Sequence, residues 1–316
     1  MAVREREDKG PPRLGAESRH WVGGYVEIPT GRVPCASTRW TWRDRLGAVA
    51  VRWNIGRMHY RVEPGLYAVG SPTAASPLLA TANYKLSFDV LRKALDGLDV
   101  WLLVLDTQGI NVWCAAGKGT FGTEELVKRM ATNGMERILS HTTLVLPQLG
   151  APGVAAHEVR RRTGFQVVYG PVRARDVAAF LRDGMRATPA MRRVRFTLWD
   201  RLAVVPTEVV RKFAPFLLTM MALFLMAGVG QHGYRLAMAQ WPGIAVAVWA
   251  NFLAGIILTP ALLPWLPGRS FALKGAEIGI VTTASLWLSG WYGLVEWAGV
   301  GLLSVAACSY LGLMFT

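Results

Sequence analysis

The stretch DVWLLVLDTQGINVWCAAGKG, residues 99–119, joins an almost wholly apolar run to a lone cysteine. The run at its start, DVWLLVLDT, is typical of a strand that is buried on both faces of a parallel sheet. The residues after it predict the start of a helix, which carries Cys114 between Trp113 and two alanines. The first question about this chain is therefore what one thiol does at the end of a buried strand.

Strand-like and helix-like segments alternate on both sides of this stretch. We expect strands over 66–70, 78–83, 99–107, 142–148 and 165–170, and helices over 87–98, 122–134, 154–164 and 173–185. Ser87 and Thr123 are the expected N-caps of the first two helices, and Gly164 is the expected end of the third. The alternation predicts an α/β, Rossmann-like domain with a doubly wound, mostly parallel sheet over residues 46–187. Such sheets bind ligands beyond the carboxyl ends of their strands.

Charged and apolar residues are segregated along the chain, which has 316 residues, 52% of them hydrophobic, and a formal net charge of +14. The charged residues after Lys212 are few: Arg235, Arg269, Lys274, Glu277 and Glu296. Residues 213–316 instead contain four apolar runs, each near the roughly 20 residues that a helix needs to cross a bilayer. Because these runs lack a polar face, they predict an all-α transmembrane helical domain with four spans.

The cations before the first apolar run predict the orientation of the chain. They include Arg192, Arg193, Arg195, Arg201, Arg211 and Lys212. Since loops rich in Lys and Arg stay cytoplasmic, residues 188–212 are a basic linker, and the α/β domain faces the cytoplasm from a multi-pass protein of the inner (cytoplasmic) membrane. Residues 1–45 are expected to be an irregular basic arm without the apolar core of a secretory signal. Membrane lipids, and not nucleic acid, are the expected partner of the basic excess.

Several interpretations of Cys114 are open. The chain has three cysteines, Cys35, Cys114 and Cys308, and they are too far apart to suggest a disulfide framework or a CxxC metal site. A phosphate-binding loop would need Gly where Val112 stands and Ser or Thr where Gly119 stands. Composition alone favours a small buried residue, and a nucleophile activated by a base from elsewhere in the chain stays open.

A further interpretation is that Cys114 ligates a metal whose other donors come from a cofactor. A macrocycle occupies four positions around its metal, so one axial ligand from the protein is enough. The small neighbours Ala115, Ala116 and Gly117 would let a broad, flat ring approach the backbone. A helix N-terminus would also stabilise the thiolate.

The motif NVWCAAGK, Asn111 to Lys118, resembles the cap-helix motif of the mercury-methylating corrinoid protein family (HgcA). The corrinoid domain of that family is similar to the large subunit of the corrinoid iron-sulfur protein of the acetyl-CoA pathway. The resemblance extends to RVEPGLYAVGSP, TANYKLSFDVLR and LPQLGAPGVAAHEVRRRTGFQVVYGPVRARD. It covers about residues 40–185, and the apolar half of the chain fits the same family.

The resemblance implies a cobalamin (corrinoid, cobalt) cofactor that is bound without its own base. Cys114 would then be the catalytic residue and the lower axial ligand of the cobalt. The other residues that the resemblance assigns to the cap around the cofactor are Asn111, Val112, Trp113, Ala115, Ala116, Gly117 and Lys118. Further contacts are expected from strand ends, at Thr81, Asn83, Gln148 and Gly153.

The implied reaction is the transfer of a methyl group from Cys-ligated methylcobalamin to Hg(II), giving methylmercury. An electron-rich thiolate trans to the methyl group favours its release as a carbanion equivalent or a radical, which suits an electrophile such as Hg(II). The chain has no ferredoxin-like cysteine cluster. Electrons are therefore expected from a ferredoxin-like 4Fe-4S electron-donor protein (HgcB-like), and the methyl group from a methyltetrahydrofolate pathway.

Two alternatives to mercury methylation remain. One is a corrinoid methyl carrier of anaerobic one-carbon metabolism, and the other is a membrane transporter or sensor with a corrinoid-binding domain. The family also has a further membrane span beyond a polar loop, whereas this chain stops at LGLMFT. A C-terminal span is therefore expected to be missing from this sequence.

Overall fold

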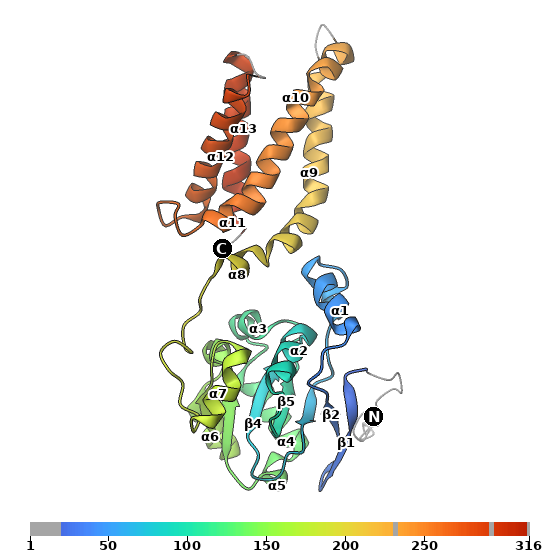
Figure 1. Ribbon diagram of the computed structural model, residues 1–316, viewed down its shortest axis with the longest axis vertical. Coiled ribbons are helices and arrows are strands. Elements are labelled where there is room, and N and C mark those ends of the chain that lie inside the picture. The colour runs from blue at the N-terminus through green and yellow to red at the C-terminus, as the bar shows by residue number, and fades with distance from the viewer. Residues whose placement is uncertain (1–19, 230–232, 291–293, 315–316) are drawn as a thin grey trace, which may run out of the picture. The chain divides into compact units, whose positions relative to one another are not determined.

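The computed structural model describes residues 20–229, 233–290 and 294–314. The chain divides into two compact units (Figure 1). The first, an α/β unit, comprises Met1–Arg45 and Met58–Arg193, and the second, a helical unit, comprises Leu46–Arg57 and Val194–Thr316. The sequence predicted that the α/β domain begins at residue 46 and ends at 187, whereas residues 46–57 group with the helical unit and the α/β unit extends to Arg193.

The α/β unit is built on a seven-stranded sheet with the order β1-β2-β3-β5-β4-β6-β7. Its strands are β1 Val22–Ile28, β2 Gly31–Ala36, β3 Gly65–Val69, β4 Leu78–Ala82, β5 Val100–Leu105, β6 Thr143–Leu146 and β7 Gln166–Tyr169. Strands β5, β4, β6 and β7 run parallel, but β3 is antiparallel to β5 and β1 is antiparallel to β2. The sheet is therefore mixed and rich in parallel pairs, as an α/β fold requires.

Helices cover both faces of this sheet (Figure 1). They are α2 Lys85–Ala94, α3 Val112–Lys118, α4 Thr123–Asn133, α5 Met135–Ile138, α6 Ala156–Thr163 and α7 Val177–Arg182, with the short 3₁₀ turns η1 Arg57–His59, η2 Gln148–Gly153 and η3 Ala174–Asp176. Every residue of β4 and β5 is buried. Leu103 and Leu105 pack with α3 to α6, while Leu102 and Val104 pack with α2 and α7, so β5 is covered on both faces as predicted.

The structure corrects three predictions about local structure. The irregular arm expected over 1–45 is wrong for residues 22–36, which form the β1–β2 hairpin, and residues 1–19 lie outside the described part. Ser87 is inside α2 and does not cap it, since the helix begins at Lys85. Thr123 is the first residue of α4, after an N-cap at Gly122, and its hydroxyl accepts a hydrogen bond from the Ala155 N–H instead. The end of α6 at Gly164, with φ +76°, is as predicted.

The helical unit contains α8 Leu198–Leu202, α9 Val205–Ala227, α10 Gly233–Leu253, the π-turn η4 Ala254–Leu258, α11 Thr259–Leu262, α12 Phe271–Leu288 and α13 Leu294–Leu313. Glycines bring α12 against α13: a Cβ on Gly275 would lie 2.1 Å from the Cys308 carbonyl oxygen, and one on Gly279 would lie 2.5 Å from that of Ser304. Helix α1, Trp42–Arg52, contains the boundary between the two units.

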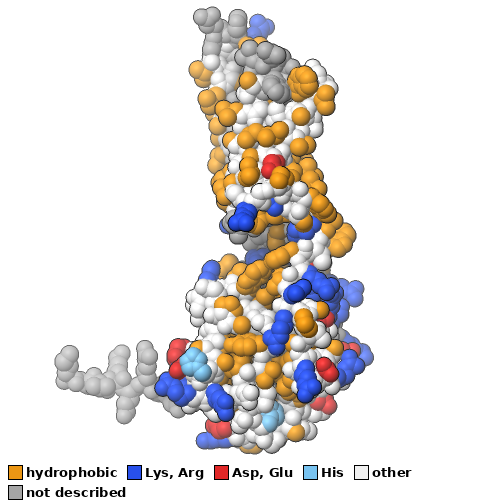
Figure 2. Space-filling model, turned by 90° about the vertical axis from the view of Figure 1, so that its left-hand side faces the viewer, with side chains coloured by type: hydrophobic (Ala, Val, Ile, Leu, Met, Phe, Trp, Pro, Cys, Tyr) orange, Lys and Arg blue, Asp and Glu red, His pale blue; other side chains and the backbone are white. Residues whose placement is uncertain are grey.

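Two stretches of this unit have the length and hydropathy of membrane spans within the described residues. They are Leu198–Ala227 and Met238–Leu262, and Ala298–Leu313 is a shorter apolar helix. Hydrophobic side chains are spread over the surface of the helical unit on the face that Figure 2 shows. The four spans predicted from the sequence correspond to α9, α10 with α11, α12 and α13, and their placement in a membrane stays a prediction.

Candidate functional site

The thiol of Cys114 is presented by α3, a helix of seven residues that follows β5. Asn111 caps this helix, because its Oδ1 accepts a hydrogen bond of 2.9 Å from the Cys114 N–H. Gly119 ends the helix in the left-handed region, at φ +79°. Cys114 is exposed and carries a free thiol in the first turn of the helix, at the carboxyl edge of the parallel strands.

The loop between β5 and α3 is held by Asn83, whose side chain is buried after the end of β4. Its Oδ1 accepts hydrogen bonds from the N–H groups of Gly109, at 2.9 Å, and Thr107, at 3.1 Å, and lies 2.8 Å from the Thr107 hydroxyl. Its Nδ2 donates to Asp106 Oδ1 at 3.0 Å. Asn83 therefore sets the conformation of the loop that positions α3.

This loop holds two consecutive residues in the left-handed region. Gln108 has φ +58° and Gly109 has φ +75°. For a residue with a Cβ, this conformation costs about 1–2 kcal/mol, and such strain collects at functional sites. The loop is also held from α4, since Glu125 accepts a hydrogen bond of 2.8 Å from the Asp106 N–H and pairs with Arg129 at 2.6 Å.

The turn η2, which follows β6, packs directly on α3 and on the residues after it. A Cβ on Gly153 would lie 2.1 Å from the Phe121 carbonyl oxygen and 3.0 Å from the Ala116 Cα. Gln148, at the other end of η2, accepts a hydrogen bond of 2.9 Å from Arg192 Nη1. Glycine at position 153 thus permits the close approach of η2 to α3.

The two faces of α3 differ sharply. Val112, Ala115 and Ala116 are buried and belong to the core of the α/β unit. Cys114 and Gly117 lie on the exposed face, with Trp113 and Lys118 also exposed, and a Cβ on Gly117 would meet nothing within 4 Å. The exposed face of α3 therefore presents one sulfur donor, and at position 117 no side chain projects from this face to hinder a broad, flat ligand.

A metal site made by protein side chains alone does not fit this surface. In the part of the chain that the structure describes, no group of three or more His, Cys, Asp or Glu side chains could hold a metal ion. Cys114 could ligate a metal only if the other donors came with a cofactor, and a macrocycle that needs one axial ligand meets that condition. The exposed thiol and the open space over Gly117 fit such a ring.

Two histidines of the α/β unit, His20 and His141, make contacts away from Cys114 and give no support for a nucleophilic cysteine. His141 is at the amino end of β6, where its Nε2 lies 2.9 Å from the Ser76 carbonyl oxygen and its Nδ1 accepts a hydrogen bond from the Thr143 N–H. His20 bonds to Asp44 at 2.8 Å. Each of these rings is thus engaged in a contact of its own rather than with Cys114.

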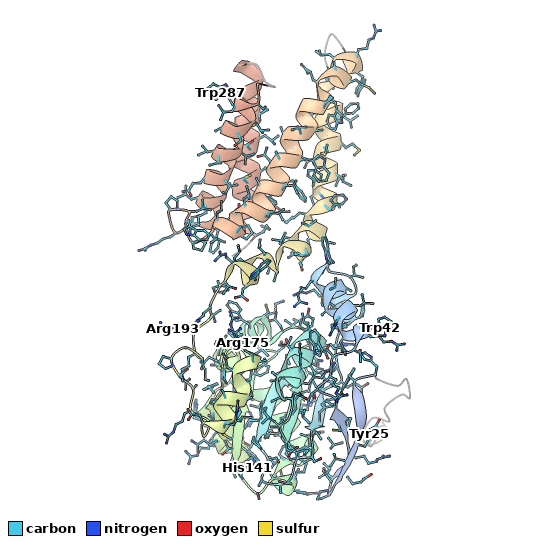
Figure 3. All side chains as sticks on the ribbon, viewed as in Figure 1. Tyr25, Trp42, His141, Arg175, Arg193 and Trp287 are labelled. Carbon is cyan, nitrogen blue, oxygen red and sulfur yellow. The ribbon has the colours of Figure 1, made fainter. Side chains whose placement is uncertain are left out.

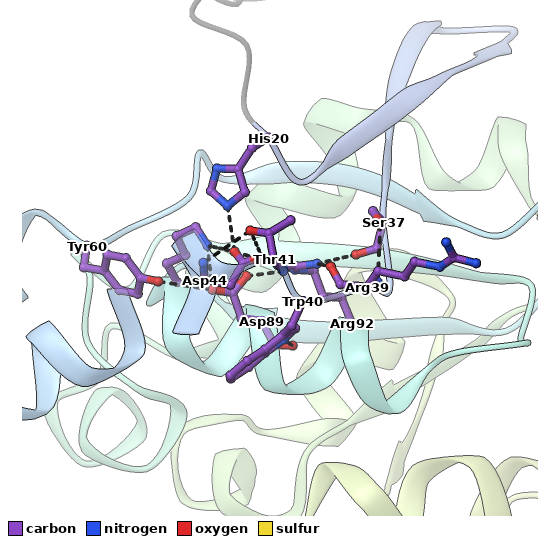
Figure 4. A network of polar contacts seen from close by, with 10 residues as sticks. His20, Ser37, Arg39, Trp40, Thr41, Asp44, Tyr60, Asp89 and Arg92 are labelled. Atoms are coloured by element: carbon purple, nitrogen blue, oxygen red, sulfur yellow. Dashed lines mark hydrogen bonds and ion pairs between the residues drawn. The ribbon is translucent and has the colours of Figure 1, made fainter. Parts of the chain in front are cut away.

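A buried network of ion pairs supports the segment beside the site (Figure 4). Asp44, Asp89 and Arg92 are fully buried, and Lys85 is nearly so. Lys85 Nζ lies 3.0 Å from Asp44 Oδ1 and 2.6 Å from Asp89 Oδ2. Arg92 Nε lies 2.8 Å from Asp89 Oδ1, and its Nη2 lies 2.9 Å from Asp44 Oδ1 as an ion pair without good hydrogen-bond alignment. Two cations thus neutralise two carboxylates inside the unit.

The network shifts the pKa values of Asp44 and Tyr60. The segment that carries Tyr60 also contacts the loop between β5 and α3. Burial alone would raise the pKa of Asp44, but hydrogen bonds from the Thr41 backbone, His20 and Lys85, with the charge of Arg92, hold it well below its usual range. Burial and the nearby carboxylates raise the pKa of Tyr60, whose hydroxyl lies 3.4 Å from Asp89 Oδ2. The segment that carries Tyr60 runs past the loop, since a Cβ on Gly109 would lie 3.5 Å from the Met58 carbonyl oxygen.

The structure brings most of the predicted site residues to one edge of the sheet. Asn111 caps α3, which the rest of the motif to Lys118 forms, and Gln148 and Gly153 are the first and last residues of η2. Thr81 is buried within β4, and the Asn83 side chain is used in holding the loop. Whether any of these side chains touches a cofactor stays a prediction. Sequence reasoning missed Asp106, Thr107 and Glu125, although a polar pair directly after a buried strand is a recognisable signal.

Fold and site together define an α/β domain that presents a single thiol from a short cap helix at the carboxyl edge of a parallel-rich sheet. Residues 52–181, which contain this site, match the family described as CO dehydrogenase/acetyl-CoA synthase delta subunit.

The curated relatives that the chain matches include the gamma subunits of the acetyl-CoA decarbonylase/synthase complex from three archaea. The subunit from Methanopyrus kandleri is 33% identical over 122 residues, which are 38% of this chain and 26% of the relative. That from Methanocaldococcus jannaschii is 33% identical over 124 residues (39% and 25%), and that from Archaeoglobus fulgidus is 30% identical over 138 residues (42% and 29%). The chain thus spans about a quarter of the length of these relatives.

Proposed function

We propose that this chain is a corrinoid-dependent methyl-transfer protein in which Cys114 would supply the sulfur ligand of the cobalt. The observation that carries the proposal is the exposed, free thiol of Cys114 on a cap helix whose outer surface is open over Gly117. The match of residues 52–181 to the family described as CO dehydrogenase/acetyl-CoA synthase delta subunit, and the similarity of the chain to acetyl-CoA decarbonylase/synthase gamma subunits, support a role in one-carbon chemistry.

The residues of α3 would divide the work of holding a cobalamin. Cys114 would give the sulfur donor, and Asn111 would keep it in place by fixing the first turn of the helix. Gly117 would leave room for the ring, while Trp113 and Lys118 would border it. When bound, a corrinoid supplies a methyl group carried on cobalt, and a thiolate ligand favours release of that group to an electrophile.

The finer proposal concerns the methyl acceptor. A sulfur ligand from the exposed Cys114 would donate electron density to the cobalt, which supports Hg(II) as the acceptor and methylmercury as the product. The names of the relatives instead support a second candidate, a methyl carrier of one-carbon metabolism. A ferredoxin-like 4Fe-4S protein as electron donor and a methyltetrahydrofolate pathway as methyl source are part of the same proposal.

We further propose that the helical unit anchors the chain in the cytoplasmic membrane. The two long apolar helices support this, together with the many large hydrophobic side chains exposed on the helical unit. The cations before α9 support a cytoplasmic position for the α/β unit.

A single anaerobic turnover tests the proposal. The full chain, reconstituted in lipid discs and loaded with methylcobalamin, is mixed with thiol-bound Hg(II), and methylmercury is measured beside free methylcobalamin. Cys114→Ala should lose the reaction and the absorption spectrum of a thiolate-ligated corrinoid. Cys35→Ala is the matched control, because Cys35 is a half-buried thiol of the same unit that donates to the Gly70 carbonyl.

The outcomes separate the candidates. A higher yield of methylmercury than free methylcobalamin gives, seen in the wild type and in Cys35→Ala but not in Cys114→Ala, would support Hg(II) as the acceptor. If the spectrum shows a thiolate-ligated corrinoid but the yield of methylmercury does not exceed that of free methylcobalamin, the methyl carrier is the candidate that remains. A wild-type chain that binds no corrinoid would refute both.

A further inference from the structure

Helix α1 carries an apolar stripe on its exposed side. The stripe consists of Trp42, Leu46 and Val49 of α1 and of Trp53, the first residue of the turn after it, with exposed fractions of 66%, 58%, 53% and 43%. Their spacing of four, three and four residues places them on one face of a helix. Large apolar side chains so exposed in a row indicate a surface that is covered by something else.

The opposite side of α1 is already packed. Asp44, Ala48 and Val51 are buried, at 0%, 3% and 1% exposure, so the stripe is not the core-facing side of the helix. Exposed arginines border the stripe on both sides, with Arg43 on one and Arg45 and Arg52 on the other. A partner of this face must therefore be apolar at its centre and anionic at its margins.

The helical unit itself places the end of α1 beside a candidate membrane span. Residues Leu46–Arg57 belong to this unit. Thr207, in the first turn of α9, donates a hydrogen bond of 2.7 Å to the Arg52 carbonyl oxygen and accepts one of 3.5 Å from Arg57 Nη1. The apolar run of α9 begins at Phe213, and at 1.5 Å per residue Thr207 lies roughly 9 Å before it along the helix, on the side of Arg211 and Lys212. With the apolar run in the membrane, the end of α1 would therefore lie at the level of the lipid headgroups.

We propose that α1 is an interfacial helix that binds the anionic surface of the bilayer, with its stripe among the lipid chains and its arginines on the headgroups. Tryptophans at the ends of the stripe suit the interface between water and hydrocarbon, and Lys or Arg beside an apolar helix face attract anionic lipids. This inference rests on the proposed membrane anchoring and adds a second contact with the membrane, outside the spans.

Hydroxyl-radical footprinting of the full chain tests the inference. The chain is reconstituted in discs of zwitterionic lipid and in discs that also contain phosphatidylglycerol, and oxidation is measured residue by residue. Trp42 and Trp53 should be oxidised several-fold less in anionic discs than in zwitterionic discs, because the arginines beside the stripe add the attraction of anionic headgroups. Tyr25 is the reference, since it is 48% exposed on β1 and lies off the stripe; Figure 3 labels it together with Trp42. Met221 and Met226 of α9 report insertion of the span.

Two variants sharpen the test. The double variant Leu46→Glu with Val49→Glu should restore oxidation of Trp42, because it places charges in the centre of the stripe. Val90→Glu is the matched control, since Val90 is a 41% exposed apolar residue on α2, and this change should leave the protection of Trp42 intact. Corrinoid binding by each variant shows that the α/β unit is folded.

Each result decides a separate point. If Met221 and Met226 are protected while Trp42 stays as reactive as Tyr25, the interfacial helix is refuted and the anchoring stands. If the two methionines are unprotected, the anchoring fails and the inference fails with it. Equal oxidation of Trp42 in zwitterionic and anionic discs would overturn the proposal that the arginines bind anionic headgroups.

Discussion

Substitution of Gly153 by Ala should weaken the packing of η2 against α3. The added Cβ would lie 2.1 Å from the Phe121 carbonyl oxygen and 3.0 Å from the Ala116 Cα, and real Cβ contacts below 3.0 Å essentially never occur. Both neighbours are backbone atoms, so they cannot yield by a change of rotamer. The turn η2 would have to move by roughly 1 Å, and overpacking of this kind costs about 1–3 kcal/mol of unfolding free energy.

The matched control is Gly117→Ala on the same helix. Its Cβ would meet nothing within 4 Å, and Ala is favoured over Gly inside a helix by about 1 kcal/mol. Thermal unfolding of the full chain in detergent, followed by circular dichroism, should give a lower midpoint for Gly153→Ala, by roughly 2–4 °C per kcal/mol. Gly117→Ala should unfold at or above the wild-type midpoint.

Corrinoid binding should respond differently from stability in these two variants. Gly153→Ala should weaken binding through the displaced helix, whereas Gly117→Ala should weaken it in a stable protein, because a methyl group would stand where the ring is proposed to lie. Equal unfolding midpoints for Gly153→Ala and the wild type would refute the argument that η2 needs glycine to seat α3. Unchanged corrinoid affinity in Gly117→Ala would refute the proposed position of the ring.

Three further predictions concern the groups that support the site. Asp44→Asn should lower the unfolding free energy by about 3–5 kcal/mol in urea titrations, because it leaves Arg92 buried with too little negative charge; a loss near zero would contradict a buried network. The folded protein holds the pKa of Asp44 below its unfolded value, which is about 4. The stabilisation from Asp44 is therefore fully present above about pH 4 and should be lost as the pH falls toward the folded pKa. Acid unfolding of the wild type against Asp44→Asn would detect this loss. Asn83→Ala should cost about 1–3 kcal/mol and speed hydrogen exchange at Gly109, since it removes the acceptor of two loop N–H groups; unchanged exchange there would argue against its role in holding the loop.

Local sequence patterns determined the central elements of the α/β unit. The uninterrupted apolar run of β5 can be buried only on both faces, and the structure buries every residue of it. Gly164 ended its helix for a local reason, because a residue at φ +76° rarely carries a Cβ. The motif around Cys114 likewise predicted a helix start, which Asn111 caps through its own side chain.

Other features were decided by contacts between distant residues. The alternation of Val22, Val26 and Ile28 is a strand signal, but two glycines between the first two weaken it, and the strand forms because β2 pairs with it and both lie on the core. The antiparallel pairing of β3 with β5 leaves no mark on either sequence. Thr123 looked like a helix cap, yet the turn before α6 supplies the donor for its hydroxyl.

The site shows the same division between sequence and tertiary structure. The sequence by itself determined which thiol stands at the end of a buried strand and which small residues surround it. Only the tertiary structure decided that Asn83 holds the loop, that η2 reaches α3 across Gly153, and that Cys114 and Gly117 share the open face. The reason is physical: a helix or strand preference is written within a few residues, whereas a hydrogen bond or a close approach depends on which segments the sheet brings together.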